Sequence, residues 1–159
     1  MKPVRSIALL TASHIFVAAI GFAAGIYALP ILTAPDAPSA EQVASKTKSV
    51  MFETEFTRAL AGSDFLHWGE GKVTINSEYV TLMGRLAPGP DYKLYFSPKF
   101  VETEAEFQAV KEKMVAVGDI KTFENFIVEL PSGFDFSQYN SIIVWCESFN
   151  EFITAAKFK

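Results

Sequence analysis

The chain has 159 residues, half of them apolar, with 15 phenylalanines but only two histidines and one cysteine. This length is enough for one domain with a hydrophobic core plus an accessory segment. The net charge of −4 and the lack of basic stretches interleaved with aromatic residues argue against nucleic acid as a partner.

The N-terminal segment predicts a membrane span. Lys2 and Arg5 are followed by residues 7–32, a run of 26 residues without a formal charge. At about 1.5 Å per residue, such a helix more than covers a bilayer core of roughly 30 Å. A cleaved signal peptide has an apolar region of about 7–15 residues and a small-x-small site. Here the sequence TAPDAPSA at 33–40 has proline where a small residue is needed. We therefore expect an uncleaved signal anchor over residues 1–32, with a cleaved peptide as the alternative.

The charges before the span predict its direction. Segments rich in Lys and Arg stay in the cytoplasm, so we expect a single-pass cell-membrane protein with its C-terminal domain outside, periplasmic or extracellular. Gly21 and Gly25 have the small-xxx-small spacing that lets two helices approach closely, which makes an anchor-mediated homodimer a further hypothesis. His14 also lies in the span, and we interpret it as a neutral imidazole near the membrane interface.

Residues 33–51 are predicted to form a linker, because they are rich in proline and small residues and poor in apolar ones. Within this segment Ser39 and Gln42 have the spacing of a capping box, which predicts a short helix after Ser39. The domain proper is expected over residues 52–159.

Strand patterns dominate this domain. Residues 71–86 alternate across Val73 and Ile75 and then Val80 and Leu82, with Asn-Ser-Glu at 76–78 as the turn, which predicts a hairpin. A proline/glycine turn then leads into a strand at 92–97. Further short strands are expected within 117–123, 125–133, 139–149 and 152–158, separated by glycine, proline, asparagine and aspartate.

One helix interrupts the strands. Thr103 and Glu106 have capping-box spacing, and Phe107, Val110 and Met114 repeat at helical intervals, so a helix is predicted over 104–114. About seven strands with one inserted helix predict an all-β fold, an antiparallel β-sandwich or flattened barrel.

Signatures of known enzyme classes are mostly absent. The sequence has no phosphate loop, dinucleotide fingerprint, serine elbow or CxxC motif. His67 and Cys146 are the only soft metal ligands outside the anchor, so no metal cluster is predicted. Paired carboxylates for hydrolysis stay open, although no spacing nominates a pair.

Cys146 belongs to a strand that is apolar on both faces. Ile142, Val144 and Cys146 share one face, whereas Ile143 and Trp145 share the other, which predicts a central strand. Free cysteine is among the most buried residue types, so Cys146 can simply be a core residue. A single cysteine in an exported domain cannot form an internal disulfide, so its thiol is either shielded or functional.

Four segments, in this order, resemble the DM-thirteen domain family: FLHWGEGKVTI, PGPDYKLYFS, FIVELP and YNSIIVWCESFNEFITAAKF. The resemblance covers about residues 54–159. It implies a β-sandwich-like module, associated with cytochrome-like DOMON domains and proposed to take part in electron transfer. In that proposal the family's single cysteine is a bare thiol or a ligand to a group such as haem. Cys146 matches that cysteine, and His67 matches the histidine of the opening motif.

Two hypotheses follow. The first is an outward-facing, membrane-anchored redox module that passes electrons to a partner protein, with Cys146 as redox candidate and His67 as its nearby partner. A reactive thiol needs a lowered pKa, and the sequence beside Cys146 supplies only Glu147, so His67 would have to lie within about one side-chain length of the sulfur. The second is a non-catalytic ligand-binding or adhesion sandwich, with 86–92 and 129–140 as binding loops and Cys146 as packing. Both hypotheses describe an accessory or binding domain rather than a stand-alone enzyme.

Overall fold

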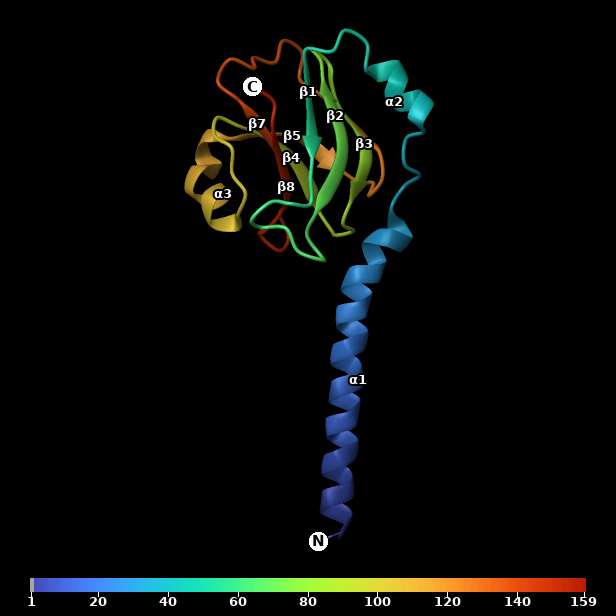
Figure 1. The fold of residues 1–159 in the computed structure, drawn as a ribbon. Helices are drawn as coiled ribbons and strands as arrows, with labels where there is room; N and C mark the ends of the chain where they lie inside the picture. Colours follow the sequence, from blue (N-terminus) through green and yellow to red (C-terminus); the bar gives the residue numbers. More distant parts are fainter. Residues whose placement is uncertain (1) are drawn as a thin grey trace. The chain divides into compact units, whose positions relative to one another are not determined.

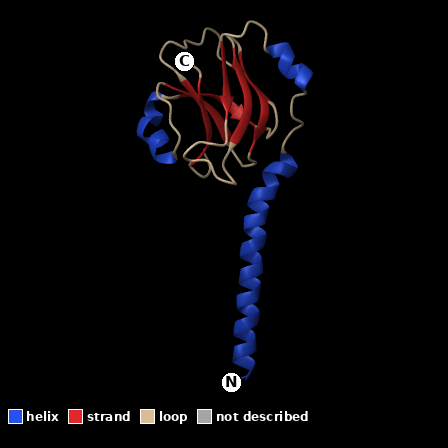
Figure 2. Cartoon of the chain, viewed as in Figure 1, coloured by secondary structure: helices blue, strands red, loops and turns tan. Residues whose placement is uncertain are grey.

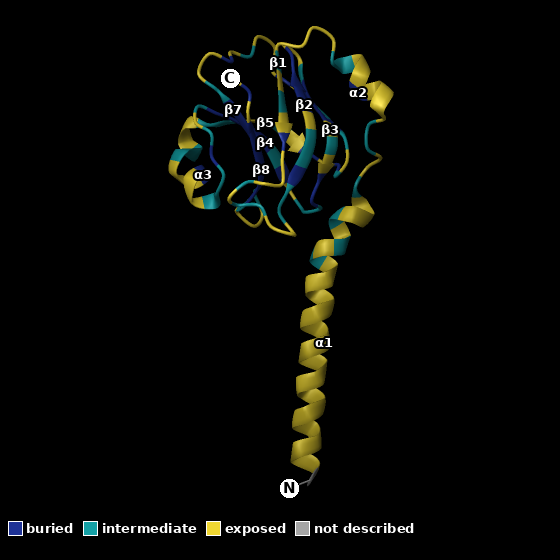
Figure 3. Ribbon diagram, viewed as in Figure 1, coloured by how far each residue is buried: buried dark blue, intermediate teal, exposed yellow. Residues whose placement is uncertain are grey.

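The computed structural model describes residues 2–159 and divides at Thr33 into two compact units. The first unit is one helix, α1 (Lys2–Thr33), drawn in blue in Figure 1. It is long and apolar enough to cross a membrane, a test that an N-terminal signal sequence also passes. Figure 3 shows that almost all of its surface is exposed. Within it, the ring of His14 is hydrogen-bonded through Nδ1 to the carbonyl oxygen of Leu10 at 2.8 Å.

The second unit, Ala34–Lys159, contains two antiparallel four-stranded sheets that form a sandwich (Figure 2). This confirms the predicted fold class. Sheet A has the order β1-β2-β3-β6, and sheet B has the order β5-β4-β7-β8. The strands of sheet A are β1 (Phe52–Phe56), β2 (Gly69–Ile75), β3 (Tyr79–Leu86) and β6 (Phe126–Glu129). Those of sheet B are β4 (Tyr92–Ser97), β5 (Val115–Ile120), β7 (Ser141–Cys146) and β8 (Glu151–Lys157).

Strand β7 contributes to two separate apolar cores, because successive side chains on a strand point to opposite faces. The inner core lies between the two sheets and receives Ile142, Val144 and Cys146. The outer core lies on the other face of sheet B, under the helix α3 (Glu104–Val110), and receives Ile143 and Trp145. Every residue of β7 is buried. The predicted central strand, apolar on both faces, is therefore confirmed.

The inserted helix is shorter than predicted. The hydroxyl of Thr103 accepts a hydrogen bond from the backbone N–H of Glu106, but the Glu106 carboxylate binds the N–H of Glu102, so only half of the capping box forms. α3 ends at Val110 and continues as a single 3-10 turn, η1 (Lys111–Lys113). The prediction of a helix to residue 114 is wrong, because β5 begins at 115 and the chain must become extended before it pairs with β4.

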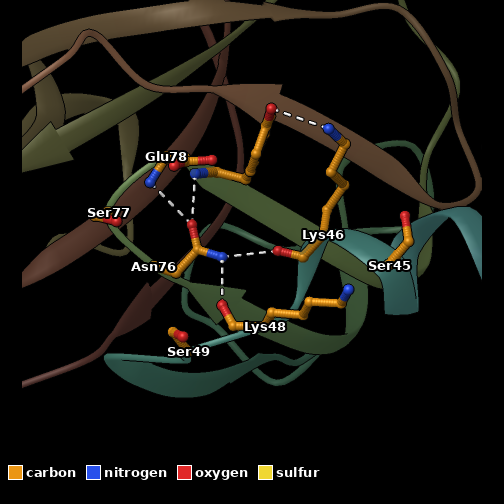
Figure 4. Close-up of a pocket in the computed structure, with 8 residues that line it drawn as sticks. Ser45, Lys46, Lys48, Ser49, Asn76, Ser77 and Glu78 are labelled. Carbon is orange, nitrogen blue, oxygen red and sulfur yellow. Dashed lines mark hydrogen bonds between the residues drawn. The ribbon is translucent and has the colours of Figure 1, made fainter.

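The segment after α1 lies against the sandwich. It contains α2 (Ala40–Lys46), whose predicted capping box of Ser39 and Gln42 is present. The side-chain amide of Asn76 donates to the carbonyl oxygens of Lys46 at 2.7 Å and Lys48 at 3.0 Å (Figure 4). That of Asn125 donates to the carbonyl oxygen at position 38, at 3.0 Å. Two asparagines of sheet A and its loops therefore hold this segment in place.

Candidate functional site

Cys146 is the last residue of β7, the strand that lies between β4 and β8 in sheet B. Only 3% of its surface is exposed. Its thiol donates a hydrogen bond to the carbonyl oxygen of Pro90, with Sγ and O 2.9 Å apart. The prediction that Cys146 lies largely buried on a central strand is confirmed.

The surroundings of Cys146 favour a protonated thiol. Burial raises its pKa above the ordinary value, and the nearby carboxylates of Asp91 and Glu151 raise it further. Backbone N–H groups of Ser148 and Phe149 act in the opposite direction without reversing the shift. Since a thiolate is the reactive form of cysteine, this site does not activate the sulfur by itself.

His67 ends the loop that precedes β2. Its Nδ1 lies 3.1 Å from Oδ2 of Asp64, and 27% of its side chain is exposed. The other carboxylate oxygen of Asp64 accepts hydrogen bonds from the backbone N–H groups of Leu66 and His67, each at 2.7 Å. The loop therefore fixes the imidazole beside a carboxylate.

The two predicted site residues lie at the same end of the sandwich. The loop between β3 and β4 links their surroundings, because Ala87 donates a backbone hydrogen bond to the carbonyl oxygen of Trp68 and Pro90 accepts the bond from Cys146. The contacts of the two side chains nevertheless differ: the imidazole faces Asp64, whereas the thiol faces Pro90. Their approach to within one side-chain length stays a prediction.

Comparison with known families agrees with this geometry. A family model described as "Electron transfer DM13" matches residues 59–158, which include both His67 and Cys146. The chain belongs to the DM13 family. No curated protein and no solved structure matches it.

The DM13 domain does not fit a haem bound through the cysteine. Cys146 is closely packed in the inner core, and the Pro90 carbonyl oxygen already occupies the direction in which the thiol points. A ligand at the sulfur would have to displace the loop 87–91 or the turn 147–150. Among residues 2–159, no three His, Cys, Asp or Glu side chains gather as a metal site would require.

The sequence analysis missed a polar cluster on the other face of sheet B. The hydroxyl of Tyr95, on β4, donates to Oε1 of Glu147, and Nζ of Lys111 donates to Oε2 of the same carboxylate at 3.0 Å. Glu147 directly follows Cys146 in the chain. A signal was present, since the outward face of β4 carries Lys93, Tyr95 and Ser97, which all have polar groups, but the partners of Tyr95 come from distant segments.

A polar pocket of about 270 Å³ lies at the opposite end of the sandwich, at the β2–β3 hairpin (Figure 4). Asn76 satisfies four backbone groups there, since its side-chain oxygen also accepts from the N–H groups of Glu78 and Tyr79. Lys46 donates to the hydroxyl of Tyr79 at 2.9 Å. These groups hold the segment after α1, and neither predicted site residue lies among them.

Proposed function

We propose that this chain is an electron-transfer module, anchored in a membrane by α1, with its DM13 domain on the outer side and Cys146 as its redox group. Membership of the electron-transfer family over 59–158 carries this proposal. The apolar helix supplies the anchor, and Lys2 and Arg5 before it supply the direction. The partner is a second redox protein, and the module acts as an accessory rather than a stand-alone enzyme.

Access to the sulfur sets the mechanism of this role. The neutral thiol is covered in the folded domain, so the turn 147–150 has to open before a partner can reach Sγ. Once the Pro90 contact is broken, an imidazole can take the thiol proton, and His67 is at the right end of the sandwich to do so. The thiolate then passes one electron to the oxidised partner protein and becomes a thiyl radical, while the proton remains on the imidazole.

The test compares the full chain with its Cys146→Ser variant, both in lipid nanodiscs, by voltammetry and visible spectroscopy. We expect a redox couple in the wild type that the variant lacks, and no Soret band in either. The same couple in both proteins would overturn the role of Cys146. A Soret band in the wild type would show that the thiol site opens for haem.

Topology has its own test. Protease added to intact spheroplasts should degrade the DM13 domain and leave α1 protected in the membrane. A domain that survives until the spheroplasts are lysed would reverse the orientation. An N-terminal sequence that begins near Glu41 would indicate cleavage instead of anchoring.

A second candidate function is a non-catalytic binding sandwich in which Cys146 is packing. The 3% exposure of Cys146 and its place in the inner core favour it. The two expected binding loops, however, cannot form one surface, since 86–92 precedes the start of β4 and 129–140 precedes the start of β7, at opposite ends of an antiparallel pair. The aromatic side chains of the second loop are also used in packing, because Phe134 and Tyr139 contact the ring of Phe96 in the inner core. If the wild type shows no redox couple and Cys146→Ser retains all partner binding, this second function stands.

A further inference from the structure

Tyr95 lies in the outer core beside the carboxylate of Glu147. The ring is 7% exposed and contacts Phe107 edge-on, with ring centroids 5.3 Å apart. Its hydroxyl donates a hydrogen bond to Glu147. A buried phenol that faces a base differs chemically from one that faces a carbonyl, because it has an acceptor for its proton.

The protonation states of this pair are well defined. Burial and the neighbouring Glu147 carboxylate raise the pKa of Tyr95, so the phenol is neutral. Burial works against ionisation of Glu147, but the hydrogen bonds from Tyr95 and Lys111 outweigh it and lower the pKa of that carboxyl. At neutral pH the proton is therefore on the tyrosine and the carboxylate is ready to accept it.

Trp145 is the other oxidisable side chain of the outer core, and it lacks such an acceptor. Its ring is fully buried and stacks on the ring of Phe107, with ring centroids 3.8 Å apart and an interplanar angle of 5°. Within residues 2–159, Nε1 of Trp145 has no hydrogen-bond partner. The ammonium of Lys111 lies 5.7 Å from the ring centroid. An oxidised Trp145 would keep its proton and be a radical cation next to that ammonium. The radical is therefore more stable on Tyr95, which can lose its proton to Glu147.

We propose that Tyr95 is a redox-active tyrosine, with Glu147 as the acceptor of its proton. Tyr95 gives one electron to an oxidised metal complex, and in the same step the phenolic O–H bond breaks and the proton bonds to Oε1 of Glu147. The products are a neutral tyrosyl radical, a protonated Glu147 and the reduced metal complex. One electron from a donor then reduces the radical, and the proton returns from Glu147 to the phenolic oxygen. The physiological use of this step rests on the proposed electron-transfer function, but its chemistry does not require Cys146.

Tyr92 provides a matched control within the same strand. It is 2% exposed and faces the inner core, and its hydroxyl donates to the carbonyl oxygen of Ala87 at 3.0 Å. A backbone carbonyl is not a base at neutral pH. The Ala87 carbonyl that accepts from Tyr92 is therefore a much weaker base than the Glu147 carboxylate that accepts from Tyr95, although both tyrosines are buried on β4.

The experiment oxidises the full chain in nanodiscs with photogenerated tris(bipyridine)ruthenium(III) and records the radical by transient absorption and electron paramagnetic resonance. We expect a neutral tyrosyl radical in the wild type, at least a tenfold lower yield in Tyr95→Phe, and an unchanged yield in Tyr92→Phe. Glu147→Gln should slow radical formation at least tenfold, because an amide cannot accept the proton. Near-ultraviolet circular dichroism checks that each variant is folded.

An unchanged radical in Tyr95→Phe, or an unchanged rate in folded Glu147→Gln, overturns the proposal. Trp145→Phe should retain the tyrosyl signal. Loss of the radical signal in this variant would mean that the radical forms on the tryptophan instead. Cys146→Ser separates this inference from the proposed function. The radical should persist in that variant, while the redox couple assigned to Cys146 should disappear. The first result tests the role of Tyr95 and the second tests that of Cys146, so each proposal can be overturned without the other.

Discussion

The inner and outer cores of sheet B share strand β7 but differ in chemistry. The inner core surrounds Cys146 with apolar side chains and one backbone carbonyl, whereas the outer core combines stacked aromatic rings with a carboxylate and an ammonium. Cys146 and Glu147 are adjacent in the chain, yet burial holds the first neutral and hydrogen bonds keep the second ionised. The face to which a side chain points therefore decides its charge state more than its position in the sequence does.

Phenylalanine truncation gives the largest contrast between the cores. Phe96 and Phe107 are both fully buried, in the inner and outer core respectively. Phe96→Ala should destabilise the fold by about 3–5 kcal/mol, a typical value for a core Phe→Ala change. Phe107→Ala should lose less, about 2–3 kcal/mol, since α3 has only seven residues and can detach locally. Thermal unfolding in detergent measures both, and equal losses would mean that the two cores unfold as one.

Replacement of Cys146 by serine should have the next largest effect. The hydroxyl is more polar than the thiol in an apolar site, so we expect a loss of about 1–3 kcal/mol. Cys146→Ala is the matched control, because it removes the sulfur without adding a polar group, and it should lose less. A serine variant at least as stable as the alanine variant would mean that the Pro90 carbonyl oxygen accepts a hydrogen bond from the new hydroxyl. Burial of the hydroxyl at this site would then cost no free energy of unfolding.

Truncation of Glu147 probes the outer core. Glu147→Ala leaves the Tyr95 hydroxyl and Lys111 without their shared acceptor, which should cost about 1–2 kcal/mol. The exposed Glu112, in the neighbouring 3-10 turn, is the matched control, and Glu112→Ala should stay within about 0.5 kcal/mol of the wild type. Similar melting temperatures for the two variants would show that solvent replaces the carboxylate without loss.

The smallest expected difference between the cores is in how folding stability changes at alkaline pH, where Cys146 and Tyr95 ionise. A raised pKa means that folding stability is complete below the ordinary pKa and falls as pH rises above it. The ordinary value is 9.0 for Cys146 and 10.0 for Tyr95. Stability should fall above about pH 9, by at most about 1.4 kcal/mol per pH unit for each group.

Variants assign this decline to the two residues. Cys146→Ala should flatten the profile of melting temperature between pH 9 and 10, whereas Tyr95→Phe should leave that interval unchanged. A profile of Cys146→Ala that runs parallel to the wild type would contradict the protonated-thiol assignment.

The sequence predicted the parts of the fold that depend on local alternation. The hairpin of β2 and β3, the strand at 92–97 and the two-faced strand β7 all follow from side-chain period. β1 (Phe52–Phe56) is not predicted by the sequence, because it has only five residues and its one alternating face carries Thr54 between two phenylalanines. The end of α3 depends on where β5 must begin to pair with β4, which is a tertiary constraint.

The candidate site was only partly predictable for the same reason. Burial of Cys146 follows from the apolar residues around it, but its partner Pro90 lies 56 positions earlier and meets it only through the pairing of β4 with β7. The cluster at Glu147 draws Tyr95 and Lys111 from segments 52 and 36 positions away. No local pattern specifies such contacts, and one sequence alone does not reveal them.

The asparagine contacts at Asn125 and Asn76 limit how far the DM13 domain can travel. α1 ends at Thr33, and the chain is held again from Pro38 onward, which leaves only residues 34–37 between them. Fully extended, that stretch spans at most about 18 Å. Under the proposed electron-transfer function, so short a tether keeps the DM13 domain within reach of α1, and we expect a redox partner that lies in, or docks on, the same bilayer.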